Sequence, residues 1–212
     1  IYRSINHCVN NSHNNLLFSD FKNPELRKYV GMTLKEVSEK LNKHYADVAI
    51  DFVIEDGSRV GVVYFLMSED NVKKQIQLPY MSFGSDAGSI APEGDFLNSN
   101  PHPRAYGNFA RLLGKYVREE KVISLENAIY KLSGLSASKL KLKERGFLKE
   151  NYFADIVIFD PNTISDHATF SEPHQLATGM HHVFVNGVQV LESGEHTGMT
   201  PGRVVRGPGY KK

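Results

Sequence analysis

The sequence predicts an α/β fold that continues into a β-rich C-terminal part, and three patterns lead to this expectation. Short apolar runs alternate with segments of helical periodicity up to about residue 140. From about residue 146 the pattern changes to short β-rich runs separated by turn residues. A chain of 212 residues with 41% hydrophobic residues is also long and apolar enough to bury a core. We therefore expect two parts, residues 1–145 and 146–212, which pack together because no linker sequence separates them.

The first sixty residues carry signals for one strand and two helices. Residues 16–18 form a short apolar run that indicates a strand. Thr33 is followed three residues later by Glu36, which is a capping box, and apolar residues then recur at helical spacing. We expect one helix over residues 34–41 and a second over residues 46–55, which an Asp-Gly pair ends.

A strand, a helix and another strand are expected next. Residues 60–67 are apolar and β-branched, as in a buried parallel strand. Ser68 is placed to cap a helix whose first turn is acidic, and Pro79 ends that helix. Residues 80–85 then form the second strand. This order with short connections is typical of an α/β sheet or barrel.

The rest of the chain is expected to hold helices first and strands afterwards. Residues 105–120 have the spacing of a long amphipathic helix, and a second helix begins after Ser124. A short helical piece follows at residues 136–140. Residues 154–159 resemble a strand, and the Asn-Gly pair at 186–187 between two alternating apolar runs predicts a hairpin.

Composition and charge exclude several classes of protein. The 25 basic and 24 acidic residues are interspersed, which argues against nucleic acid or an anionic membrane as the main partner. The longest apolar run, residues 60–67, is too short to span a bilayer. The single cysteine, Cys8, rules out an internal disulfide framework and agrees with a reducing, cytoplasmic compartment. The chain starts at Ile1 with neither an initiator Met nor a signal-peptide pattern, so we expect sequence upstream of it.

Two segments carry the strongest candidates for chemistry. Asp86 follows the apolar run of residues 80–85, where barrel enzymes place catalytic groups, although an Asp in this position can equally cap a turn. After a polar loop come His102 and Arg104, in the order Pro-His-Pro-Arg. The planar guanidinium of Arg104 could hold a carboxylate through two hydrogen bonds, or it could form an ordinary surface ion pair. The sequence pattern leaves these alternatives open.

Metal-ligand motifs are missing from the sequence. A zinc hydrolase needs about three protein ligands, and no HxH, HExxH or CxxC pattern is present. The pair His181-His182 lies on an expected strand, where neighbouring side chains point to opposite faces, so both cannot bind one ion. A second cluster of His7, Cys8 and His13 could bind metal adventitiously.

Four long blocks in one order and spacing make the chain similar to a known family. These blocks are GSDAGSIAPEG, PHPRAYGNFARLLGKYVREE, YFADIVIFDP and HHVFVNGVQVLESGEHTGMTPGRVVRGPG. They closely resemble the C-terminal part of the N-acyl-D-amino-acid deacylases, or D-aminoacylases, of the metal-dependent amidohydrolase superfamily. The resemblance extends from about Asn15 to the end of the chain.

The resemblance implies a fold and a set of roles. The chain would form the last part of a (β/α)8 barrel followed by strands of a small β-sandwich. Asp86, at the end of the eighth barrel strand, would move the proton from water to the leaving nitrogen and could also contact the metal. Arg104 of the HPR motif would bind the substrate carboxylate. His102 could line the same pocket or orient the loop, and Tyr106 could point to the pocket or to the helix interface.

The function implied is hydrolysis of an N-acyl-D-amino acid by a zinc enzyme. The principal zinc ligands, a cysteine and histidines, would lie upstream, so the isolated chain is expected to be inactive. A missing N-terminal barrel segment or a companion chain would complete it, because about a third of a barrel cannot enclose a core. Two alternatives are another amidohydrolase, dipeptidase-like or acting on cyclic amides, and a non-catalytic remnant or interaction module.

Overall fold

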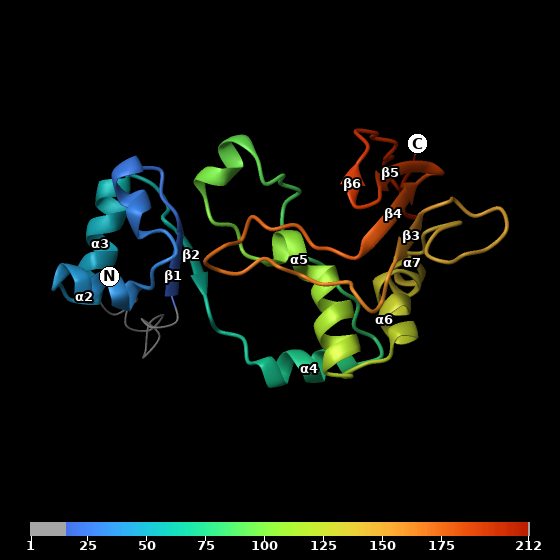
Figure 1. Cartoon of the computed structure of the whole chain (residues 1–212), viewed down its shortest axis with the longest axis horizontal. Coiled ribbons are helices and arrows are strands. Elements are labelled where there is room, and N and C mark those ends of the chain that lie inside the picture. The colour runs from blue at the N-terminus through green and yellow to red at the C-terminus, as the bar shows by residue number, and fades with distance from the viewer. Residues whose placement is uncertain (1–15, 212) are drawn as a thin grey trace. The chain divides into compact units, whose positions relative to one another are not determined.

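The computed structural model describes residues 16–211, which fall into two compact units (Figure 1). The first unit contains the described residues up to Ser68, together with Ala87–Ala105 and Ala168–Gln175. The second contains Glu69–Asp86, Tyr106–His167 and the chain from Leu176 onward. The boundary expected between residues 145 and 146 stays a prediction.

The first unit pairs two short strands and covers them with two helices. Strand β1 (Leu16–Asp20) runs antiparallel to β2 (Gly61–Tyr64), and helices α2 (Leu34–Leu41) and α3 (Tyr45–Asp56) lie between them in sequence. Figure 1 shows both helices beside the β1–β2 pair. Two 3-10 helices complete the unit, Pro24–Tyr29 and Gly94–Asn98.

Local signals explain where α2 begins and what holds this unit together. The Thr33 hydroxyl accepts the backbone N–H of Glu36 at 3.2 Å, and the Glu36 carboxylate accepts the N–H of Thr33 at 2.7 Å. The predicted capping box is therefore confirmed, and so is the helix over 34–41. An aromatic cluster forms the core, in which the rings of Phe18, Phe21 and Phe52 lie 5.3 to 5.5 Å apart.

The second unit contains a set of helices followed by an antiparallel sheet. The helices are α4 (Glu69–Gln77), α5 (Arg104–Arg111, which enters this unit at Tyr106), a π-helix (Leu112–Glu119), α6 (Leu125–Leu132) and α7 (Gly134–Lys139). The strands, in sheet order, are β3 (Ile156–Phe159), β4 (Met180–Val185), β5 (Val188–Glu192) and β6 (Glu195–His196). The apolar faces of the π-helix and α6 share one core.

The β4–β5 hairpin forms at the predicted place. Asn186 has φ 51° and Gly187 has φ 82°, so both turn residues occupy the left-handed region that a tight two-residue hairpin turn requires. The N–H of Gly187 also donates to the carbonyl of Ala154 at 3.0 Å, which ties the turn to the chain before β3.

Two predicted strands differ from the structure. Residues 60–67 were expected to form a buried parallel strand, but only Gly61–Tyr64 is a strand, and it runs antiparallel to β1. Residues 80–85 form no strand. Among residues 16–211 neither segment has the parallel neighbour that its prediction assumed. A strand needs neighbours along its edges, and the described residues provide a partner for only one of these segments.

The fold is therefore a mixture of helices and strands with no closed barrel among residues 16–211. In the same described range, no helix is both long enough and apolar enough to cross a membrane.

Candidate active site

Asp86 lies at the end of the segment that leads out of α4. Its side chain is exposed, and its backbone has φ 49°, a left-handed conformation that Asp adopts more readily than most residues. Two residues earlier, the carbonyl of Gly84 accepts a hydrogen bond from Asn108 Nδ2 at 3.2 Å. Helix α5 therefore holds the approach to Asp86, while the carboxylate itself faces solvent.

A buried lysine anchors the start of the same segment. Lys131 of α6 is 1% exposed, and its Nζ donates to the carbonyls of Ile76 and Leu78, the latter at 2.7 Å. The ammonium also lies 5.9 Å from the centre of the Phe83 ring. Burial lowers the pKa of Lys131. A cation at the C-terminal end of α4 satisfies carbonyls that have no partner within the helix.

Sequence reasoning missed Lys131 because lysine is seldom buried. The only available signal was its position three residues after Ala128 on the apolar face of α6, and that pattern is also typical of a lysine whose tip reaches solvent.

His102 caps the first turn of α5. Its Nδ1 accepts the backbone N–H of Arg104 at 3.1 Å, and its carbonyl accepts the N–H of Ala105 at 2.9 Å. The imidazole also packs edge-on against Phe170, with the ring centres 5.0 Å apart. Burial, assisted by the positive charge of Arg104, lowers the pKa of His102. The ring is therefore neutral at pH 7, and its proton is on Nε2 because Nδ1 is the acceptor.

Arg104 and Tyr106 occupy the first turn of α5, and both are half-buried. Burial raises the pKa of Tyr106, so its phenol stays protonated over the physiological range. His102 and Arg104 belong to the first compact unit, whereas Asp86 and Tyr106 belong to the second. The four predicted site residues are thus divided equally between the two units.

No preformed metal site lies in the described part of the chain. Residues 16–211 contain no group of three or more His, Cys, Asp or Glu side chains arranged to hold an ion. His182 instead pairs with Gln189 on the neighbouring strand, at 3.0 Å between Nδ1 and Nε2. The candidates His7, Cys8 and His13 lie outside the described residues. Asp86 is therefore the one predicted metal-contacting group that the structure describes.

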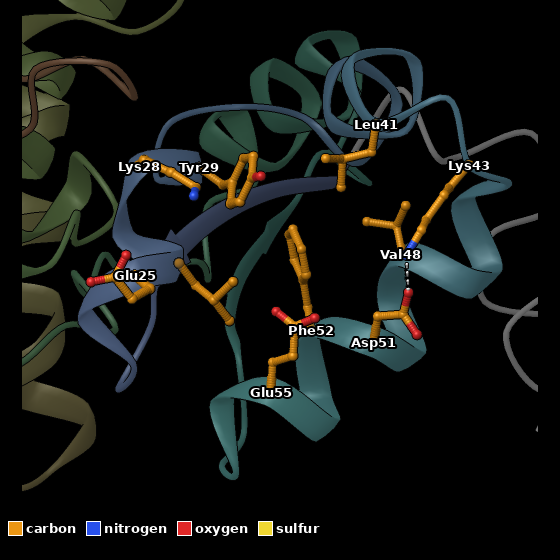
Figure 2. A pocket seen from close by; sticks show the side chains of 10 residues that line it. Glu25, Lys28, Tyr29, Leu41, Lys43, Val48, Asp51, Phe52 and Glu55 are labelled. Carbon is orange, nitrogen blue, oxygen red and sulfur yellow. Dashed lines mark hydrogen bonds and ion pairs between the residues drawn. The ribbon is translucent and has the colours of Figure 1, made fainter.

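The first unit also has a small pocket, of about 190 Å³, that contains none of the predicted site residues (Figure 2). Two lysines and three acids are among the side chains that line it, and Figure 2 shows Lys43 reaching Asp51, at 2.8 Å. The charges of this pocket largely cancel.

Comparison with known proteins places the chain in a family. Residues 81–191, just over half of the chain, match the profile of the amidohydrolase family. The N-acyl-D-aspartate deacylase of Alcaligenes xylosoxydans xylosoxydans is 38% identical over 178 residues, which are 81% of this chain and 34% of that protein.

Solved structures agree with this result. A crystal structure of D-aminoacylase superposes with a TM-score of 0.77 at 35% identity, covering 90% of this chain and 37% of that one. The N-acyl-D-glutamate deacylase of Bordetella bronchiseptica, solved with zinc and a phosphonate inhibitor, gives a TM-score of 0.71 at 33% identity, covering 83% of this chain and 34% of the other. The chain thus spans about a third of the length of these relatives. On this evidence it belongs to the amidohydrolase family, and the resemblance to the N-acyl-D-amino-acid deacylases that its sequence predicts is confirmed.

Proposed function

We propose that this chain supplies the C-terminal part of a metal-dependent deacylase that hydrolyses N-acyl-D-amino acids to a carboxylate and a free D-amino acid. The observation that carries the proposal is the similarity to deacylases, at 33 to 38% identity, across more than four-fifths of the chain and through both compact units. The substrate and the metal follow from the names of these relatives, two of which are an N-acyl-D-aspartate deacylase and a zinc-containing N-acyl-D-glutamate deacylase.

In the complete enzyme, residues 60–67 and 80–85 would be the last two strands of a (β/α)8 barrel, and the C-terminal sheet would belong to a β-sandwich. Exposed apolar side chains after β2 support this assignment. Leu66 and Met67 are each 69% exposed, although their sequence is that of a buried strand. Neighbouring barrel strands or helices would cover them. An upstream segment or a companion chain would provide those elements.

The described residues could supply only one predicted ligand, Asp86, to a metal ion. Asp86 offers one exposed carboxylate, which is a suitable oxygen donor for zinc, but within residues 16–211 it belongs to no group of three or more potential ligands. The remaining ligands have to come from outside this range. Zinc, when bound, would lower the pKa of the attacking water and polarise the amide carbonyl.

The role proposed for Asp86 is proton transfer. Its carboxylate would take a proton from the attacking water and pass it to the amide nitrogen as the C–N bond breaks. The left-handed backbone at Asp86 and the bond from Asn108 to Gly84 support this role, because they fix the backbone that carries this exposed side chain.

The three residues near the start of α5 would bind the substrate. The Arg104 guanidinium would hold the substrate carboxylate through two charge-assisted hydrogen bonds. His102 is neutral with its proton on Nε2, so it can donate one hydrogen bond to an oxygen of the substrate. Tyr106, whose raised pKa keeps it protonated, can donate a second.

A zinc-supplemented assay of D-amino acid release tests this function. N-acetyl-D-aspartate, N-acetyl-D-glutamate, their L-enantiomers and a cyclic imide are offered to this chain and to a longer protein that includes the upstream barrel. We expect no turnover by the 212-residue chain. The longer protein should hydrolyse the D-substrates, and Asp86→Asn should lower its kcat by about 10²- to 10⁴-fold.

Other outcomes of the assay separate the alternatives. Hydrolysis of only the cyclic imide would assign the chain to another amidohydrolase activity. A folded longer protein with no activity on any substrate would favour a non-catalytic remnant. Turnover by the 212-residue chain that Asp86→Asn abolishes would show that a metal site forms within it or between its copies.

A further inference from the structure

A strongly basic pocket lies in the second unit, between the segment after α7 and the C-terminal tail. Its volume is about 480 Å³, and its lining includes five cationic side chains, Lys141, Lys143, Arg145, Arg203 and Arg206, together with Tyr210. No acidic side chain lines it in the part of the chain that the structure describes. We call this site the basic pocket.

Specific contacts hold the tail in place and shape the basic pocket. Arg145 Nη2 donates to Asn186 Oδ1 at 2.6 Å, and Asn186 Nδ2 in turn donates to the carbonyl of Pro201 at 2.7 Å. The tail is thus tied to the β4–β5 turn. The Arg206 guanidinium stacks on the ring of Tyr210, 3.8 Å from its centre, which preorganises one wall of the pocket.

The charge of the basic pocket is largely uncompensated. Arg145 forms an ion pair with Asp155. Within residues 16–211, the other four cations have no acidic partner at ion-pair distance. The pocket of Figure 2 has a more balanced charge than the basic pocket. Its two lysines share the lining with three carboxylates, and one of the lysines forms an ion pair. Since the whole chain carries a net charge of only +1, the basic pocket is a local concentration of charge.

We propose that the basic pocket binds a small soluble anion that carries several phosphate charges, of the class of pyrophosphate or a nucleoside polyphosphate. The arginine guanidinium matches phosphate oxygens through paired hydrogen bonds, and four uncompensated cations require a multiply charged ligand. The volume lies within the usual range for small-molecule sites, roughly 300 to 1,000 Å³. An N-acyl-D-amino acid with one or two carboxylates would leave at least half of these four charges unmatched, so the site is separate from the function proposed above.

Isothermal titration calorimetry of the 212-residue chain with pyrophosphate, in 0.15 M salt, tests the proposal. The double variant Arg203→Gln/Arg206→Gln should weaken binding by at least about tenfold, because it removes two guanidinium groups that would make charge-assisted hydrogen bonds to phosphate. The matched control is Lys28→Gln/Lys43→Gln, which removes the same charge from the pocket of Figure 2 and should change Kd by less than about twofold. Circular dichroism melts of both variants verify that they stay folded.

Four results would overturn the proposal. The first is no binding of pyrophosphate at millimolar concentration, and the second is an equal loss of affinity in the control variant. The third is succinate binding as tightly as pyrophosphate, which would remove the assignment to phosphate chemistry. The fourth is binding of a short single-stranded oligonucleotide without binding of pyrophosphate, which would show that these cations form a surface for nucleic acid.

Discussion

Asp56 is the last residue of helix α3, and its carboxylate is buried within the first unit. It is 5% exposed, and it accepts hydrogen bonds from the N–H of Asn23 at 2.8 Å and from the Ser58 hydroxyl. Burial alone would raise the pKa of Asp56, but the hydrogen bonds from Ser58, Asn23 and Lys22 outweigh it and hold the pKa below its usual value. The folded state therefore binds this proton less tightly than the unfolded state does. The stabilisation is complete above the usual pKa and is lost as pH falls through the lowered one.

We predict that Asp56→Asn lowers the free energy of unfolding by about 1 to 3 kcal/mol at pH 7, because the amide cannot replace a charged acceptor. The difference from the original chain should shrink below about pH 4, where the unfolded carboxyl begins to protonate. Urea denaturation at pH 7 and pH 3 measures both values. The control Asp51→Asn, which removes only an exposed ion pair with Lys43, should cost less than about 1 kcal/mol. A pH-independent difference would contradict this explanation.

Lys131 also makes stability rise with pH, but in a more alkaline range than Asp56 does. Because burial lowers its pKa, the unfolded state holds more protons between the lowered value and the usual one, and stability rises with pH across that window. Lys131→Met should abolish this alkaline rise. It should also cost about 1 to 3 kcal/mol at pH 7, because the carbonyls of Ile76 and Leu78 lose their donor.

Urea denaturation of Lys131→Met at pH 7 and pH 9.5 measures both effects. Lys139→Met is the matched control, since Lys139 is an exposed lysine in the last turn of α7. If the two variants behave alike, Lys131 does not anchor α4.

At the scale of single elements, the β4–β5 turn depends on glycine. Gly187 has φ 82°, and a Cβ added there would meet nothing closer than 4.0 Å, so a side chain fits in space but strains the backbone. We predict that Gly187→Ala lowers the free energy of unfolding by about 1 to 2 kcal/mol. Gly202→Ala is the matched control, because its added Cβ also meets open space without a positive φ. Equal thermal stability of the two variants would show that the turn tolerates strain.

The elements that the sequence predicted well are those whose signals are local. Thr33 and Ser124 each cap a helix within three residues of themselves, and Asn186-Gly187 sets its hairpin by its own backbone. The segments 60–67 and 80–85 were mispredicted because a parallel strand depends on neighbours that are remote in sequence.

The same distinction applies to the candidate sites. Asp86 and the His-Pro-Arg segment were found because they are contiguous motifs. Lys131 and the basic pocket were missed because they arise where distant segments meet, the latter between residues 141–145 and 203–210. Periodicity and spacing within one segment contain no information about tertiary contacts between segments that are distant in sequence.

At the scale of the whole molecule, the proposed barrel would give residues 60–67 and 80–85 neighbouring strands that residues 16–211 do not supply, since this chain spans about a third of its relatives. In a longer protein that includes the upstream barrel, we predict slower amide hydrogen exchange at both segments than in the 212-residue chain, because they gain hydrogen-bonded neighbours. Hydrogen-exchange mass spectrometry compares the two proteins, with residues 34–56 as an internal reference that should not change. Equal exchange at 60–67 and 80–85 would refute the barrel assignment.

The π-helix at Leu112–Glu119 has a consequence for how the length of this chain can change. Its wider turns are visible where the N–H of Glu120 bonds five residues back, to Lys115 at 2.8 Å, so the segment holds more residues than an α-helix of equal rise. Loss of a single residue there could be absorbed by a return to α-helical bonding, with helix α5 and the chain after Glu120 kept in register. The same deletion in α6 would turn everything after it by about 100° and pull Lys131 away from α4. In natural length variants of this family, a one-residue deletion should therefore be tolerated better within residues 112–119 than within α6.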